Sequence, residues 1–117
     1  MGVLSRPFSE GVHPTEARRL MAQEALLVDV REAWEWAAGR ATGAHHVPLD
    51  RLAARMDELP RDRKVVVVCR SGNRSAHATT MLRGAGVDAV NLDGGLHAWS
   101  AAGLPLVTDG HEPGRVA

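Results

Sequence analysis

The sequence predicts an α/β fold, a three-layer sandwich whose mainly parallel central sheet of four to five strands carries helices on both faces. Short apolar strand patterns alternate along the chain with segments of helical periodicity, and the connections between them are short. The four valines at 65–68 are typical of a strand buried on both faces of a parallel sheet. A chain of 117 residues is long enough for one domain that builds its core without disulfides or metal.

The predicted elements run from residue 12 to residue 108, which we take as one domain. The predicted strands share β-branched or aliphatic runs and lie at 25–30, 65–68 and 87–92, with a short extended piece at 47–49. The predicted helices share an apolar spacing near 3.6 residues or a glycine or proline boundary, and lie at 14–21, 32–38, 49–59, 75–84 and 96–101. The ends are short, polar and rich in Gly and Pro, which predicts a flexible N-terminal segment at 1–11 and a loosely held C-terminal tail at 109–117.

Composition narrows the possible classes of function. The formal net charge is zero, whereas nucleic-acid and membrane-surface proteins need a marked basic excess, so we expect neither kind of partner. One cysteine excludes an intramolecular disulfide and suits a reducing compartment. No segment approaches the roughly 18 apolar residues of a membrane span, and residues 1–10 lack the hydrophobic block of a secretory signal. A cytoplasmic location is therefore expected.

The valine strand ends on the only cysteine, Cys69, and the turn Arg70-Ser71-Gly72-Asn73-Arg74-Ser75 leads into the next helix. Open α/β sheets bind ligands beyond the carboxyl ends of their strands, where a helix N-terminus offers unpaired backbone N–H groups and positive dipole. Arg70 and Arg74 add positive charge, and residues 63–87 contain no acidic side chain. Such surroundings favour the thiolate and can lower a cysteine pKa from about 8.5 to roughly 3.5–7.5.

The segment from Cys69 to Ser75 resembles the active-site loop of the rhodanese family, sulfurtransferases that carry a sulfane sulfur as a cysteine persulfide. Further segments similar to that family follow its order: Leu-Val-Asp-Val-Arg-Glu at 27–32, Trp-Glu-Trp at 34–36, Gly-Ala-His-His-Val-Pro-Leu at 43–49, Asn-Leu-Asp-Gly-Gly-Leu-His-Ala-Trp at 91–99 and Ala-Gly-Leu-Pro at 102–105. Arg40 and Thr42 stand where the family usually has a histidine and a proline, so the contacts of that loop are expected to differ. The resemblance covers nearly the whole chain and implies a rhodanese-like fold.

The resemblance implies a double displacement at Cys69. The thiolate would take the outer sulfur of thiosulfate or a related persulfide donor, and the Cys69 persulfide would then pass it to cyanide, a small thiol or a thioredoxin-like protein. Arg70 and Arg74 would bind and orient the anionic donor. Backbone N–H groups of the loop, which also contains Ser71, Gly72, Asn73 and Ser75, would hold the persulfide. Because the attacking sulfur is already ionised, the reaction needs no general base, and we expect no cofactor.

Two other classes of function compete with sulfur transfer. Cysteine phosphatases and arsenate reductases also place a nucleophilic cysteine at a strand end, but five residues separate it from the arginine that closes their loop. Here four residues separate Cys69 from Arg74, and a shorter loop suits a sulfur atom better than a phosphoryl group. A non-catalytic sulfur carrier or redox-sensing module is the third class, since exposed cysteines of low pKa oxidise readily. A buried structural cysteine would leave Arg70 and Arg74 unexplained.

Three other sets of residues have alternative roles. Asp29 and Arg31 follow the first strand, and we favour a structural pairing that supports the loop over a direct catalytic role. Trp34 and Trp36 could line a substrate entrance, but tryptophans more often fill a core, which we favour here. His45-His46 could suggest a metal, but neighbours in an extended segment point to opposite sides and no ligand cluster accompanies them. We therefore predict no metal site.

Overall fold

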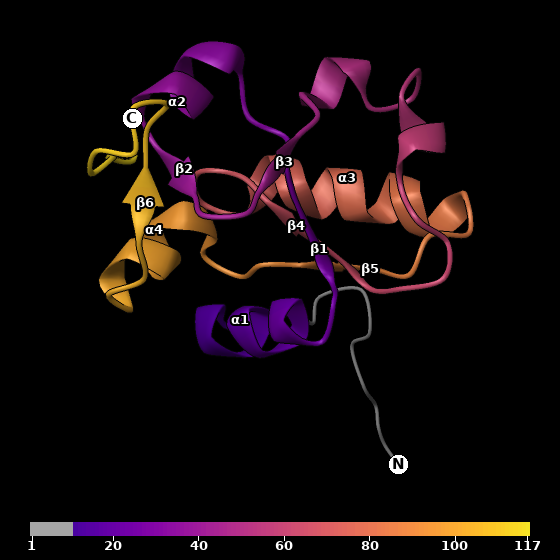
Figure 1. Cartoon of the computed structure of the whole chain (residues 1–117). Coiled ribbons are helices and arrows are strands. Elements are labelled where there is room, and N and C mark those ends of the chain that lie inside the picture. The colour runs from indigo at the N-terminus through magenta and orange to yellow at the C-terminus, as the bar shows by residue number, and fades with distance from the viewer. Residues whose placement is uncertain (1–10) are drawn as a thin grey trace.

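The computed structural model describes residues 11–117, so all of the predicted N-terminal segment except Gly11 lies outside the described residues. Its centre is a four-stranded sheet in the order β3 (His45–His46), β1 (Leu26–Asp29), β4 (Val65–Val68) and β5 (Ala89–Asn91). All three strand pairings are parallel (Figure 1). The valine run is the buried strand β4, near the middle of the sheet, as its β-branched sequence predicts.

Helices cover both faces of this sheet, which confirms the predicted three-layer α/β sandwich. Alternate residues of β4 point to opposite faces. Val65 and Val67 pack with α3 (Asn73–Gly84), whereas Val66 and Val68 pack with α1 (Pro14–Ala22) and α4 (Gly95–Ala101). In Figure 1, α1 and α3 lie on opposite sides of the strands.

The register brings the carboxyl ends of three strands to one edge of the sheet. Val68 of β4 aligns with Asp29 of β1, and Asp29 aligns with His46 of β3. Cys69 follows β4 directly, and α2 (Ala33–Ala38) begins shortly after β1. The segments that follow β1, β3 and β4 therefore meet where open α/β sheets bind their ligands.

A second, two-stranded sheet was not predicted. β2 (Arg40–Ala41) pairs antiparallel with β6 (Leu106–Val107), and the following residues stay on the domain. Gly114 N donates a hydrogen bond to the Leu106 carbonyl, and Arg115 N donates one to the Ala38 carbonyl. Residues 109–117, predicted as a loosely held tail, are thus bonded by their backbone beside α2.

The predicted helix at 49–59 is wrong. The segment forms two short 3₁₀ helices, η2 (Leu49–Arg51) and η3 (Met56–Glu58), separated by a turn in which Arg55 has φ −111° and ψ 14°. Leu52 and Leu59 are buried, so the apolar spacing was interpreted correctly as a core-facing side. Spacing identifies the buried side chains, but it does not distinguish the tighter turns of a 3₁₀ helix from those of an α-helix.

No helix described within residues 11–117 is both long and apolar enough to cross a membrane. Over the same residues, no group of three or more His, Cys, Asp or Glu side chains lies close enough together to hold a metal ion.

Candidate active site

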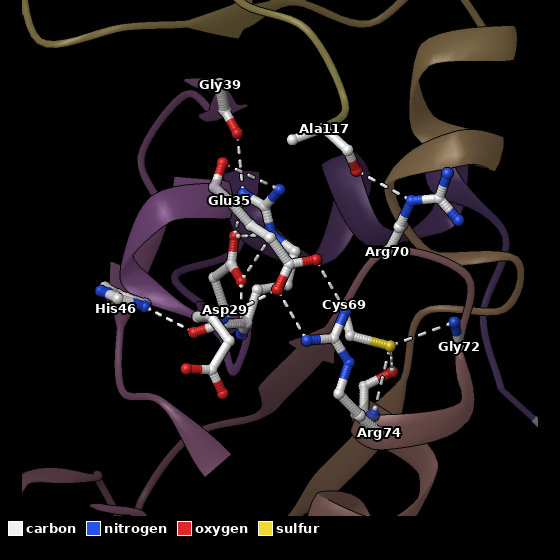
Figure 2. Close-up of polar contacts among 12 residues, drawn as sticks. Asp29, Glu35, Gly39, His46, Cys69, Arg70, Gly72, Arg74 and Ala117 are labelled. Atoms are coloured by element: carbon white, nitrogen blue, oxygen red, sulfur yellow. Dashed lines mark hydrogen bonds and ion pairs between the residues drawn. The ribbon is translucent and has the colours of Figure 1, made fainter. Parts of the chain in front are cut away.

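The Cys69 sulfur lies inside a loop that directs hydrogen-bond donors at it. Sγ accepts the backbone N–H of Gly72 at 3.1 Å and the backbone N–H of Ser75 at 3.3 Å. The Ser75 hydroxyl donates a third hydrogen bond at 3.2 Å. Figure 2 shows the sulfur enclosed between Gly72 and the first turn of α3. We call this set of donors, from Gly72 and Ser75, the sulfur cradle.

Glycines on two sides of the loop permit this curl. Gly72 precedes α3 with φ +114°, a left-handed conformation that side chains rarely adopt. Gly95, the first residue of α4, lies against the backbone of the Cys69 loop. A Cβ at this position would lie 2.5 Å from the carbonyl oxygens of Cys69 and Arg70. Those two carbonyls accept the N–H groups of Leu96 and His97, at 2.9 and 3.1 Å. The first turn of α4 therefore fixes the backbone of the loop at Cys69 and Arg70 through these hydrogen bonds.

Two opposing effects act on the Cys69 thiol. Burial raises the pKa of the thiol, while the Ser75 hydroxyl and the backbone N–H groups of Ser75, Gly72 and Ser71 lower it. The hydrogen bonds prevail, and the pKa lies below its ordinary value. The cradle itself is therefore the physical cause of the lowered pKa of Cys69.

Access to the sulfur is narrow. Cys69 is only 1% exposed, although Arg70, Ser71 and Asn73 of the same loop are exposed. Two surface cavities of about 430 and 410 Å³ are lined by residues outside this loop. The arrangement suits the slim end of a small molecule, such as a terminal sulfur atom, better than a bulky group.

The two arginines of the loop have different environments. Arg70 is exposed, and its Nε donates to the backbone oxygen of Ala117 at 2.8 Å. Arg74 is half-buried, and its two terminal nitrogens donate to the two carboxylate oxygens of Glu35 at 2.7 and 2.8 Å. Sequence reasoning assigned the same donor-binding role to both arginines. The structure brings both to the loop, but within residues 11–117 it pairs only Arg74 with an acidic side chain.

Glu35 is the residue that sequence reasoning missed. It lies in α2, is 3% exposed, and also accepts the backbone N–H of Glu32 at 2.9 Å. The hydrogen bond from Arg74 is the main cause that keeps the pKa of Glu35 below its usual range. The spacing Glu32-x-x-Glu35 resembles a helix capping box, and both bonds of such a box are present. That spacing could have identified Glu35 as a helix-start residue, but not as the partner of Arg74.

Asp29 and Arg31 pair with each other, and neither is exposed to solvent. Arg31 donates to both carboxylate oxygens of Asp29, and its terminal nitrogens reach the backbone carbonyls of Glu35 and Gly39 at 3.3 and 2.7 Å. The pair thereby joins the end of β1 to the middle of α2 and to Gly39, the residue that follows the helix (Figure 2). It contacts the helix that carries Glu35 rather than the sulfur.

The preference for core packing is wrong for Trp34, which is 67% exposed. In the six-residue helix α2, Glu35 takes the buried position and turns the preceding side chain outward. Trp36 is half-buried and stacks on the His46 ring. The Arg40 guanidinium lies over the Trp36 ring, 4.6 Å from its centroid. This stack joins α2 to the ends of β2 and β3.

Comparison with known proteins adds independent evidence. The model of the Rhodanese-like domain family matches residues 13–102. A protein named sulfurtransferase from Allochromatium vinosum is 44% identical over 86 residues, which cover 73% of this chain and 80% of that protein. A rhodanese-related protein from Thermoplasma volcanium has a crystal structure that superposes with a TM-score of 0.80, at 29% identity, over 86% of this chain and 99% of that one.

One relative is longer than the matched region. An uncharacterized protein of Synechocystis is 39% identical over 104 residues, which cover 87% of this chain. The match spans only 58% of the length of that relative. The matched unit therefore also occurs as one part of a larger protein.

Proposed function

Because this chain belongs to the rhodanese-like family, we propose that it is a sulfurtransferase that carries a sulfane sulfur as a persulfide on Cys69. The observation that carries this proposal is the sulfur cradle, in which three donors from Gly72 and Ser75 surround a thiol of lowered pKa. A persulfide anion on Cys69 would need the same kind of stabilisation by hydrogen bonds.

The first half-reaction transfers one sulfur atom to the enzyme. With thiosulfate as donor, the Cys69 thiolate attacks the outer sulfur and forms a new S–S bond. The S–S bond of thiosulfate breaks, and its electron pair leaves with sulfite. The charge is conserved, since a thiolate and a dianion become a persulfide anion and a sulfite dianion. Arg70, exposed at the mouth of the loop, orients the anionic donor.

The second half-reaction returns the thiolate. A nucleophile attacks the outer sulfur of the persulfide, the Cys69 S–S bond breaks, and its electrons return to Sγ. Cyanide leaves as thiocyanate, and a thiolate acceptor leaves as a new persulfide, on a small thiol or on a thioredoxin-like protein. Neither half-reaction moves a proton, so the cycle is compatible with the partners of Sγ within residues 11–117, which include no histidine.

Two measurements test the proposal. Thiosulfate and cyanide should yield thiocyanate with the protein and not with Cys69→Ser, and mass spectrometry after thiosulfate treatment should show one added sulfur atom on Cys69. Hydrolysis of nitrophenyl phosphate without sulfur loading would instead indicate a phosphatase. Persulfide formation without turnover to any acceptor would indicate a sulfur carrier.

A further inference from the structure

The ion pair between Glu35 and Arg74 changes the charge that a sulfur donor meets. Both terminal nitrogens of Arg74 bond to the Glu35 carboxylate, which is almost fully buried. A guanidinium that is paired in this way, in partly water-excluded surroundings, contributes little net positive charge to its neighbourhood. Arg74 therefore supports the loop without acting as a full cation for the donor.

Arg74 nevertheless lies close enough to the sulfur for their charges to interact. The pKa of Arg74 is raised mainly by the hydrogen bond to Glu35, and the charges of Cys69 and Glu32 act in the same direction. Glu32 is exposed and begins the same helix. The carboxylates of Glu35, in α2, and of Glu32, the N-cap residue of that helix, thus act on the arginine whose charge interacts with that of Cys69.

The two other arginines near this sheet edge, Arg31 and Arg70, differ in how much positive charge they offer to a donor. Arg31 is fully buried and bonded to Asp29 on both carboxylate oxygens. Arg70 is exposed, and within the described residues its bonded partner is a backbone oxygen, that of Ala117. Among the described arginines of this edge, Arg70 alone is not bonded to an Asp or Glu side chain. Because Glu35 compensates Arg74, the site offers less positive charge than two unpaired guanidinium groups would, which matches a donor with one negative charge better than a dianion.

We infer, resting on the sulfur transfer proposed above, that Glu35 is a specificity-determining residue that makes the site prefer monoanionic sulfane-sulfur donors over dianionic ones. It acts through Arg74 by cancelling the charge that a dianion would need. Donors of this class are organic persulfide anions and thiosulfonates. Attack by the thiolate breaks their S–S bond, and the electron pair leaves with a thiolate or a sulfinate.

The test compares two donors of similar shape and different charge. Thiosulfate is a dianion, and methanethiosulfonate has a methyl group in place of one charged oxygen. The measured quantity is the ratio of kcat/KM for methanethiosulfonate to kcat/KM for thiosulfate, with cyanide as acceptor. The two donors differ in intrinsic reactivity, but this difference is the same for every variant and cancels when the ratio is compared between variants.

Glu35→Gln should lower that ratio by about tenfold, because it leaves the Arg74 charge uncompensated while keeping an oxygen for the Glu32 N–H. The double variant Glu35→Gln with Arg74→Gln has the same net charge at this pair as the wild type, so its ratio should return towards the wild-type value. A ratio that moves equally in the single and double variants, or in neither, would overturn the inference.

Glu32→Gln provides a second route if Glu35→Gln does not fold. Glu32 is exposed, and its loss should change the ratio in the same direction by a smaller factor. The matched control is Glu16→Gln, which removes a carboxylate from an arginine pair with Arg19 on α1 and should leave the ratio unchanged. An unchanged ratio in both α2 variants would refute the inference even with normal folding.

Failure of the inference can be told apart from failure of the proposed function. If either donor loads one sulfur on Cys69 but the ratio does not respond to Glu35→Gln, sulfur transfer stands and the role of Glu35 falls. If neither donor loads sulfur on Cys69 in the wild-type protein, the proposed function itself falls.

Discussion

Two arginine–carboxylate pairs stand at the same edge of the sheet, and they differ in origin and in contacts. Asp29 and Arg31 are two residues apart, and both side chains are fully buried. Glu35 and Arg74 are 39 residues apart, and the arginine side chain is 35% exposed. The first pair joins β1 to α2, whereas the second joins α2 to the loop around Cys69. We therefore expect the first pair to support the fold and the second to act on the loop around Cys69.

The largest expected effect is on the buried pair. Asp29→Ala would leave the Arg31 guanidinium buried without its carboxylate, which costs about 3–5 kcal/mol in the free energy of unfolding. Urea denaturation followed by circular dichroism measures this loss. Asp29→Asn, which keeps oxygen acceptors, should lose less. Equal stability of Asp29→Ala and the wild type would show that Arg31 finds other partners.

Removing Arg74 should cost less stability. Arg74→Gln leaves the buried Glu35 with weaker donors and is expected to lower the free energy of unfolding by about 1–3 kcal/mol, because the arginine is partly exposed and its pairing is screened by solvent. The same denaturation assay checks the value. A loss larger than that of Asp29→Ala would reverse the proposed division between the two pairs.

Lowering the pH should show how much the Glu35–Arg74 pair contributes to the free energy of unfolding. The folded-state pKa of Glu35 is lowered by Arg74, so its contribution to stability is fully present above the unfolded-state pKa and is lost as the pH falls through the lower folded-state pKa. The wild type should therefore lose more stability than Glu35→Gln as the pH falls below about 4.3, the ordinary glutamate value. Parallel stability curves for the two proteins would contradict this assignment.

The smallest expected effect on stability comes from the cradle. Ser75→Ala removes the hydroxyl that is the first of the groups lowering the Cys69 pKa, so the pKa should rise towards its ordinary value. The pH dependence of alkylation by iodoacetamide measures this pKa, and its midpoint should move to higher pH. Glu35→Gln should move this midpoint less than Ser75→Ala does. The opposite order would make the ion pair, not the cradle, the main support of the thiolate.

Much of the fold and part of the site followed from local patterns. The valine run predicted the buried parallel strand, and the only cysteine at its end predicted where the loop would lie. The arginines of the loop were equally visible, but their unequal pairing was not. The segment 49–59 and Trp34 were predicted wrongly because apolar character alone does not determine a hydrogen-bond pattern or a burial.

The sequence by itself determined the layers, the central strand and the position of Cys69 at the end of that strand, because side-chain periodicity and β-branching act over a few residues. Only the tertiary structure decided that Glu35 compensates Arg74, that Gly95 supports the loop from behind, and that residues 109–117 bond beside α2. These contacts join segments far apart along the chain, so they depend on the register of the sheet and the placement of α2 and α4, which no short stretch of sequence encodes.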